Sequence, residues 1–217
     1  MIPFDWHGFD PAEFARENIT FPESIRRSVT KRQAEFFMGR MAARQALRAA
    51  GHPAVEIATG PHREPRWPAG VTGSITHAGG FAAAVVVSSR DYMGVGIDIE
   101  RVVDPATRVS IEHSILTPGE CEFLEGVDTT RSREELLTMI FSAKESFFKG
   151  SFNTVGRYFG FEAIALIAID ASAGAGRLEF ELLEALSPDL PCGHRVVVRY
   201  RFIDALTVMT SFAWPTA

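Results

Sequence analysis

Two carboxylates end a strand that otherwise has the composition of a buried one. Residues 94–100, GVGIDIE, are apolar and often β-branched until Asp98 and Glu100. Side chains two residues apart on a strand share a face, so both carboxylates project together. About 4 Å apart they would repel by about 4 kcal/mol in a protein-like medium, so we expect a cation beside them. Oxygen ligands without clustered His or Cys favour Mg²⁺ or Mn²⁺. The alternative is a solvated pair of acids or a pair with Arg101, which is the commoner meaning of this short pattern.

A second group of reactive side chains lies in residues 141–150, FSAKESFFKG. Glu145 and Lys149 are four residues apart, so on a helix they share a face. The chain has 19 arginines and three lysines, and two of the lysines are Lys144 and Lys149, which indicates a local need for a compact ammonium group. We therefore consider Glu145 as a third metal ligand or general base and Lys149 as a partner for a phosphate oxygen. The alternative is a surface ion pair, which contributes little stability.

A third segment, GSITHAGG at residues 73–80, places His77 near Ser74 and Thr76 between small residues. Hydroxyl and imidazole groups in such a setting suit a phosphate-binding turn. Basic residues elsewhere in the first half could complete an anion site, namely Arg32, Arg40, Arg63 and Arg66. Each of these arginines, taken alone, is better explained as a solvated surface charge.

Three helices are expected to position these residues. Thr30 and Gln33 form a T-x-x-Q capping box, after which no breaker appears before Gly51. A short helix is predicted from Thr117 to Leu124, because Pro118 and Glu120 follow a threonine cap. Ser132 and Glu135 predict the cap of a longer helix that runs to Gly150.

Strand-like segments follow each long helix. In the first half they include FAAAVVVSS and GVGIDIE, and in the second half FGFEAIALIAID, GRLEFELLEAL, RVVVRYRFI and ALTVMTSFA. A helix followed by several strands, stated twice, predicts an α+β protein with two similar halves. We expect residues 1–103 to form the first half and residues 104–217 the second.

Composition narrows the functional class. Charged residues at 23% and hydrophobic residues at 46% are typical of a soluble globular protein. The net charge is +3 over residues 1–90 and −8 over residues 91–217, without a dense basic stripe, which disfavours nucleic-acid binding. Neither a signal peptide nor a membrane-spanning segment is indicated, so we expect a cytoplasmic protein. Cys121 and Cys192 indicate neither a zinc site nor a disulfide framework.

Five stretches together resemble the Sfp-type 4′-phosphopantetheinyl transferases, especially those that serve siderophore and other nonribosomal peptide synthetases. They are KRQAEFFMGRMAAR, REPRWPAGVTGSITH, GVGIDIE, ILTPGE and FSAKESFFK. They span roughly residues 30–160. The resemblance implies an enzyme that moves the phosphopantetheine group of coenzyme A to a serine of an acyl or peptidyl carrier protein and releases adenosine 3′,5′-bisphosphate. It also implies two pseudo-symmetric halves, each with a helix on a mainly antiparallel sheet, and an active site in the cleft between them.

The resemblance also implies roles for individual residues. Mg²⁺ would be held by Asp98, Glu100 and Glu145, and Glu145 would also help to remove the serine proton. Lys149 would stabilise charge on the pyrophosphate. The coenzyme A site would comprise Arg32, Arg40, Arg63, Arg66, Ser74, Thr76, His77, Lys144 and Lys149. Phe141 stands where the family often has tryptophan, which changes packing and no chemistry. The second half would hold the catalytic helix and dock the carrier protein.

Two other functions fit part of the pattern. A metal-dependent phosphodiesterase could use three carboxylates, although it would not require the lysines. A non-catalytic module that binds coenzyme A could keep the fold, although it would not require the acids. Two halves within one chain favour a monomer. The sequence does not identify the carrier protein, its docking surface or the tolerance for acylated coenzyme A.

Overall fold

The computed structural model describes residues 1–170 and 174–216. The chain forms two compact units, which we call unit 1 and unit 2. Unit 1 contains Met1–Val95 and the last residues from Pro215, and unit 2 contains Gly96–Trp214. The division falls within one strand, so residues 96–101 and their two carboxylates lie in unit 2. The predicted boundary at residue 103 stays a prediction for the functional halves.

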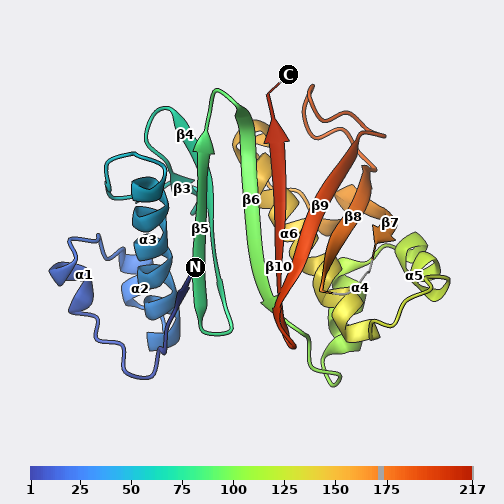
Figure 1. Cartoon of the computed structure of the whole chain (residues 1–217), viewed down its shortest axis with the longest axis horizontal. Helices are drawn as coiled ribbons and strands as arrows, with labels where there is room; N and C mark the ends of the chain where they lie inside the picture. The colour runs from blue at the N-terminus through green and yellow to red at the C-terminus, as the bar shows by residue number, and fades with distance from the viewer. Residues whose placement is uncertain (171–173, 217) are drawn as a thin grey trace. The chain divides into compact units, whose positions relative to one another are not determined.

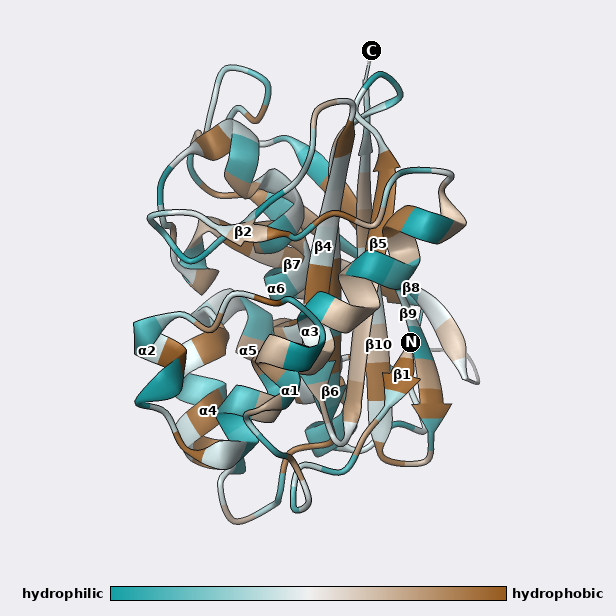
Figure 2. Cartoon of the chain, turned by 90° about the vertical axis from the view of Figure 1, so that its left-hand side faces the viewer, coloured by the Kyte–Doolittle hydropathy of each residue, from teal (hydrophilic) through white to brown (hydrophobic). Residues whose placement is uncertain are grey.

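Unit 1 is built around one long helix and one small antiparallel sheet (Figure 1). The helix α3 (Thr30–Ala49) packs on β4 (Val71–Ala78) and β5 (Phe81–Ser88). The strand β1 (Ile2–Pro3) pairs with β5, so the sheet order is β1-β5-β4. The remaining elements are α1 (Glu13–Arg16), α2 (Glu23–Arg26) and the short hairpin of β2 (Ala58–Thr59) and β3 (Pro65–Arg66). Figure 2 colours each residue by hydropathy; β5 is apolar from Phe81 to Val87, whereas β4 also buries the polar residues Thr72, Ser74 and Thr76.

Unit 2 contains a five-stranded sheet in the order β6-β10-β9-β8-β7. The strands are β6 (Tyr92–Arg101), β7 (Ile164–Asp170), β8 (Ala175–Leu182), β9 (Arg195–Asp204) and β10 (Thr207–Pro215). The helices are α4 (Arg108–Ile115), α5 (Pro118–Glu125), α6 (Arg133–Val155) and the short 3₁₀ helix η1 (Phe161–Ala163). The strand β9 alternates exposed and buried residues, so the sheet buries one face against the core that includes α6. The prediction of helices on mainly antiparallel sheets is confirmed.

Two of the three predicted helix caps are confirmed. Thr117 and Glu120 form the complete capping box of α5, and Ser132 and Glu135 form that of α6. The cap predicted for α3 is wrong. Its N-cap residue has no side-chain bond, and Gln33 donates instead to the carbonyl oxygens of Arg26 and Ser28. An amide donates as well as accepts, so Gln33 joins α3 to the preceding turn.

The helix α6 extends beyond its predicted end. It passes through Gly150 and ends at Val155, where Gly156 adopts a left-handed conformation with φ of 69°. Gly156 is therefore the terminating glycine. Gly150 has a different use, because its backbone lies where β6 approaches the helix closely.

No helix within the described residues is both long enough and apolar enough to span a membrane. The largest core is in unit 2 and includes Leu137, Ile140 and Phe147 of α6 together with inward-facing residues of the sheet. This core fixes α6 against the sheet, and with it the segment that carries Glu145 and Lys149.

Candidate functional site

The strand β6 and the helix α6 bring the predicted acidic and basic residues of unit 2 together. The ammonium nitrogen Nζ of Lys149 lies 2.5 Å from Oδ1 of Asp98 and 4.0 Å from Oε2 of Glu145. Asp98 is 4% exposed, whereas Lys149 and Glu145 are 27% and 29% exposed. A buried carboxylate thus faces two groups that solvent can reach. We call Asp98, Glu100, Glu145 and Lys149 the acidic cluster.

A row of small residues on α6 allows β6 to approach the helix closely. Ser142, Ser146 and Gly150 recur every four residues and therefore share one face of α6. The hydroxyl of Thr210 on β10 donates to the carbonyl oxygen of Ser142 at 2.7 Å. Thr210 then accepts from the hydroxyls of Ser142 at 2.9 Å and Ser146 at 2.7 Å. Gly96 on β6 lies opposite this row, and a side chain at Gly96 would collide with the α6 backbone.

Two carboxylates of the acidic cluster, Glu100 and Glu145, are destabilised in their charged forms. Burial, followed by repulsion from Asp98, raises the pKa of Glu100 to about 7, although Lys149 opposes the shift. Burial also raises the pKa of Glu145, which Lys149 again opposes and Asp98 reinforces. Negative charge is therefore crowded here, and Lys149 is the cation that offsets it.

The donor set suits a hard divalent cation, because it consists of carboxylate oxygens that repel one another. Within residues 1–170 and 174–216, however, no three His, Cys, Asp or Glu side chains already converge as a metal site. In the structure the cation beside Asp98 is the ammonium group of Lys149. The Mg²⁺ or Mn²⁺ site predicted from the sequence stays a prediction.

Lys144, which the resemblance assigns to the coenzyme A site, is buried in unit 2. Its side chain is 1% exposed, and Nζ donates to the carbonyl oxygens of Ile115 and Phe161 and to Oε2 of Glu120 at 2.8–3.0 Å. All three ammonium donors are therefore used inside unit 2. A phosphate could reach this group only if the local structure opened.

A pocket of about 200 Å³ borders Glu145 in unit 2. Its lining is mostly aromatic and apolar, and it also includes Lys144 next to Glu145; the apolar members are Phe148, Tyr158, Phe159, Phe161 and Ile164. The lining residues come from α6, from the segment between α6 and β7, and from the first residue of β7. A substrate in this pocket would contact apolar surface on one side and a carboxylate on the other.

In unit 1, two of the predicted phosphate-binding residues contact each other. Arg32 donates to Nε2 of His77 at 2.8 Å. Because an arginine cannot accept, the proton of a neutral His77 lies on Nδ1, which is 3.6 Å from Oε2 of Glu35. Arg32 also lies 3.8 Å from the same carboxylate oxygen. The helix α3 and the strand β4 thus place a basic pair on one surface of unit 1.

Arg40 is unusually buried for an arginine. It is 7% exposed, donates to the hydroxyl of Thr59 at 2.8 Å and stacks on the ring of Phe36. Burial lowers the pKa of Arg40 to about 10, with an additional lowering from the charge of Arg32 and an opposing effect of Glu56. A cation that is held at an electrostatic cost next to another cation suits an anionic ligand.

The hairpin of β2 and β3 carries the other two arginines. Arg63 occupies the turn with φ of 68°, and Arg66 lies on β3, 3.9 Å from Glu64. The hydrogen bond from Arg40 to Thr59 on β2 connects this hairpin to α3. Two exposed arginines therefore belong to the same part of unit 1 as Arg40.

The predicted phosphate-binding turn around His77 is wrong. Residues 71–78 form the strand β4, so Ser74 and Thr76 share one face and His77 lies on the other. Ser74 and Thr76 are also buried, at 2% and 3% exposure. A continuous ladder with β5 overrides the local preference of the small residues for a turn.

Four residues with a structural role in the site did not emerge as candidates from the sequence. They are Gly96, Glu120, Ser142 and Thr210. Gly96 stood within the motif GVGIDIE, and Glu120 within a recognised capping box, so both had a visible signal. Ser142 and Thr210 gave none, because their contact joins residues 68 positions apart.

Comparison with protein families gives two adjoining matches. Residues 21–87 match the family model described as the 4′-phosphopantetheinyl transferase N-terminal domain. Residues 94–190 match the model described as the 4′-phosphopantetheinyl transferase superfamily. The second match contains the whole acidic cluster, and the first contains Arg32, Arg40 and His77.

Curated relatives agree with these matches. The chain is 40% identical over 158 residues to enterobactin synthase component D of Shigella flexneri, covering 69% of this chain and 73% of the relative. It is 34% identical over 171 residues to the 4′-phosphopantetheinyl transferase Svp of Streptomyces mobaraensis, covering 77% and 68%. It is also 34% identical over 167 residues to the 4′-phosphopantetheinyl transferase PptT of Mycobacterium tuberculosis, covering 73% and 69%.

Proposed function

Because the chain belongs to the 4′-phosphopantetheinyl transferase superfamily, we propose that it transfers 4′-phosphopantetheine from coenzyme A to a serine of a carrier protein. The observation that supports this most directly is the contact of Lys149 with Asp98 and Glu145 beside the apolar pocket. The alternatives of a phosphodiesterase and a non-catalytic module find no support in these relatives.

The reaction forms a bond between the serine oxygen and the phosphorus on the pantetheine side of coenzyme A. The bond from that phosphorus to the bridging pyrophosphate oxygen breaks, and adenosine 3′,5′-bisphosphate leaves with the electron pair. Glu145 accepts the serine proton, since it is partly exposed and its raised pKa makes it a better base. Lys149 offsets charge that develops on the phosphate oxygens.

Mg²⁺ would be held by Asp98, Glu100 and Glu145. It would supply charge neutralisation at the pyrophosphate. The residues fit this ion because they offer carboxylate oxygens in a region of crowded negative charge. In the metal-free protein Lys149 serves part of that purpose, and its partial exposure allows it to turn toward a phosphate.

The phosphates and nucleotide of coenzyme A would bind to the basic residues of unit 1. Arg40 supplies a buried positive charge, and Arg32 and His77 supply an adjacent pair. Arg63 and Arg66 on the hairpin would contribute exposed charges. Ser74 and Thr76 are poorer candidates, since both lie buried on the other face of β4.

The carrier is proposed to be a peptidyl carrier domain of a siderophore synthetase. The support is the name enterobactin synthase component D, which the relative from Shigella flexneri bears. The names of the relatives from Streptomyces mobaraensis and Mycobacterium tuberculosis specify the transfer and no pathway. Acyl carrier proteins therefore belong in the same test. Monomeric state and cytoplasmic location stay predictions.

The test is mass spectrometry of apo carrier proteins after incubation with the protein, coenzyme A and Mg²⁺. We expect a mass gain of one phosphopantetheine group on the serine and equimolar adenosine 3′,5′-bisphosphate. A panel from peptide, polyketide and fatty-acid synthesis ranks the carriers by kcat/KM. Absence of any mass gain across the panel would contradict the proposed function.

Variants of the acidic cluster test the assignment of residues. Glu145→Gln and Asp98→Ala should abolish the Mg²⁺-dependent mass gain and retain the circular dichroism of the wild type. Arg195→Ala is the matched control, since Arg195 is an exposed β9 residue whose side chain pairs with Glu181. Full activity of either cluster variant would remove that residue from the mechanism.

A further inference from the structure

Lys144 and Glu120 form a buried ion pair, and Lys144 directly precedes Glu145 of the acidic cluster in the sequence. We propose that this pair positions the side chain of Glu145 and holds one wall of the pocket that borders Glu145. The inference rests on the transferase function proposed above. Both side chains are at most 1% exposed, and the ammonium and carboxylate groups are bonded to each other, so we assign them a positioning role.

Lys144 ties α6 to two other segments of unit 2. Its ammonium group donates at 2.9 Å to the carbonyl oxygen of Ile115, the last residue of α4, and at 3.0 Å to that of Phe161 in η1. Phe161 is also part of the pocket lining. One side chain of α6 therefore anchors both the end of a helix and the pocket wall.

Glu120 links the ammonium group of Lys144 to α5 and β7. Its Oε2 accepts from Lys144 at 2.8 Å and from the backbone nitrogen of Thr117 at 2.8 Å, which completes the α5 cap. Its Oε1 accepts from the backbone nitrogen of Leu166 at 2.8 Å. Leu166 lies on the edge strand β7, next to an irregularity in its pairing with β8. The carboxylate thus satisfies an edge donor that the sheet leaves available.

The position of Lys144 in the chain connects the pair to the chemistry. Lys144 and Glu145 are consecutive on α6, so their side chains leave the helix about 100° apart. An anchor on Lys144 therefore fixes the rotation of this helical turn about its axis. Since Asp98 and Lys149 lie on the Glu145 side, that rotation decides whether the three groups meet.

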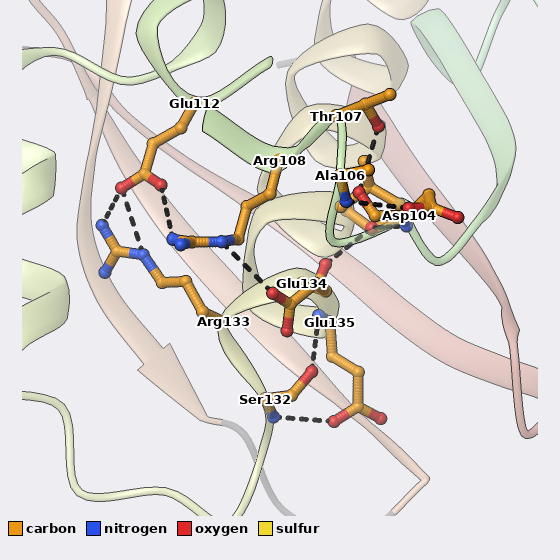
Figure 3. A network of polar contacts seen from close by, with 11 residues as sticks. Asp104, Ala106, Thr107, Arg108, Glu112, Ser132, Arg133, Glu134 and Glu135 are labelled. Carbon is orange, nitrogen blue, oxygen red and sulfur yellow. Dashed lines mark hydrogen bonds and ion pairs between the residues drawn. The ribbon is translucent and has the colours of Figure 1, made fainter. Parts of the chain in front are cut away.

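Stability alone is a weak reason for such a pair. A buried ion pair often stabilises a fold no better than apolar residues of similar size would. The attachment of α4 to α6 is already provided elsewhere by a second network, in which Glu112 on α4 accepts from Arg108 and Arg133 (Figure 3). In the same network Arg108 contacts Glu134 on α6 at 3.2 Å. The pair of Lys144 and Glu120 adds a constraint on the rotation of the α6 turn that carries Glu145.

The test uses the double variant Lys144→Met/Glu120→Gln in the full chain. Both charges are removed together, so no unpaired charge stays buried, and glutamine keeps an acceptor oxygen for Leu166. The control is Glu112→Gln, which breaks the second network of unit 2 at a distance from Glu145 in the sequence. The readouts are near-ultraviolet circular dichroism, urea unfolding, kcat, KM for coenzyme A, and the calorimetric Kd for Mg²⁺ in the presence of coenzyme A.

We expect kcat of the folded double variant to fall at least tenfold, while KM for coenzyme A changes less than threefold. The Kd for Mg²⁺ should rise at least fivefold. The control should lose a similar amount of stability and keep kcat within twofold of the wild type. A folded double variant with wild-type kcat and Kd would overturn the proposal.

Two further arms keep the result decisive. If the double variant does not fold, Glu120→Gln alone is measured, since the buried lysine can then lose its proton. The same fall in kcat and rise in Kd is expected, and wild-type values would overturn the proposal. If the wild type transfers no phosphopantetheine to any carrier, the proposed function fails, and the Kd comparison still decides whether the pair positions the cluster.

Discussion

Gly96 on β6 faces the carbonyl oxygen of Ser146 on α6 with no room for a side chain between them. A Cβ atom on Gly96 would lie 1.8 Å from that oxygen and 2.7 Å from the backbone nitrogen of Gly150. Both contacts are with backbone, which cannot turn aside as a side chain can. The two carboxylates of β6 reach α6 because the strand has no side chain at this point.

Gly96→Ala is expected to lower the free energy of unfolding by at least 1–3 kcal/mol, as overpacked cores do. The strand must move away from α6, so Mg²⁺ binding should weaken as well. Urea unfolding and calorimetry measure the two effects. Gly119→Ala is the control, because nothing lies within 4 Å of its added Cβ and it sits on α5. There we expect a gain of about 0.5–1 kcal/mol. Equal stability of both variants would refute the close-approach argument.

Lys149→Ala should reduce kcat/KM for carrier modification by about 10²–10³-fold, a magnitude typical of a lost electrostatic contact in a transition state. Lys149 contacts Asp98, so its removal also takes away a positive charge that offsets the carboxylates. Binding of Mg²⁺ should be retained, since the ion can supply that charge. Steady-state kinetics with the carrier panel and calorimetry measure the two properties. An unchanged kcat/KM would exclude Lys149 from the reaction.

The affinity for Mg²⁺ is expected to rise as the pH increases through 7. The pKa of Glu100 is raised to about 7 in the metal-free protein, chiefly by burial, so a proton competes with the ion below that pH. Calorimetry from pH 6 to 8 should show proton release on binding. Glu100→Gln should flatten the pH dependence, and an unchanged slope in that variant would assign the proton elsewhere.

The raised pKa of Glu100 also makes the free energy of unfolding depend on pH when no metal is bound. Between the ordinary pKa of 4.5 and about 7, the folded protein holds a proton that the unfolded chain has released. The free energy of unfolding should therefore fall as the pH rises through this window. Glu100→Gln should reduce this fall, which urea unfolding at several pH values would measure.

Arg40→Met should weaken the binding of coenzyme A without lowering the stability of the protein. Burial lowers the pKa of Arg40 to about 10, so the free protein bears a cost for its charge. Loss of the bond to Thr59 offsets part of the gain. We expect the coenzyme-free variant to be as stable as the wild type or about 1 kcal/mol more stable. KM for coenzyme A should rise at least tenfold with a smaller change in kcat. A lower stability with unchanged KM would make Arg40 structural.

Local patterns were sufficient where one element carries both partners. The period of two on β6 placed Asp98 and Glu100 on one face, and the helical spacing of Glu145 and Lys149 gave the ion pair that the structure contains. The caps at Thr117 and Ser132 were predicted correctly because a glutamate three residues on accepts from the cap backbone, whereas Gln33 of α3 donates to the preceding turn instead. The turn predicted at Ser74 failed because pairing with β5, a tertiary contact, outweighed local preference.

The sequence by itself determined which residues are available for the proposed chemistry: three carboxylates, a conspicuous pair of lysines and basic residues in the first half. Only the tertiary structure decided where each lysine side chain lies. Lys144 turns into the core, where three oxygens surround a compact ammonium group, and Lys149 turns toward Asp98. The physical reason is that a side chain's role depends on which distant groups surround it. Those neighbours, such as Glu120 for Lys144 and Asp98 for Lys149, come from other elements and are set by packing.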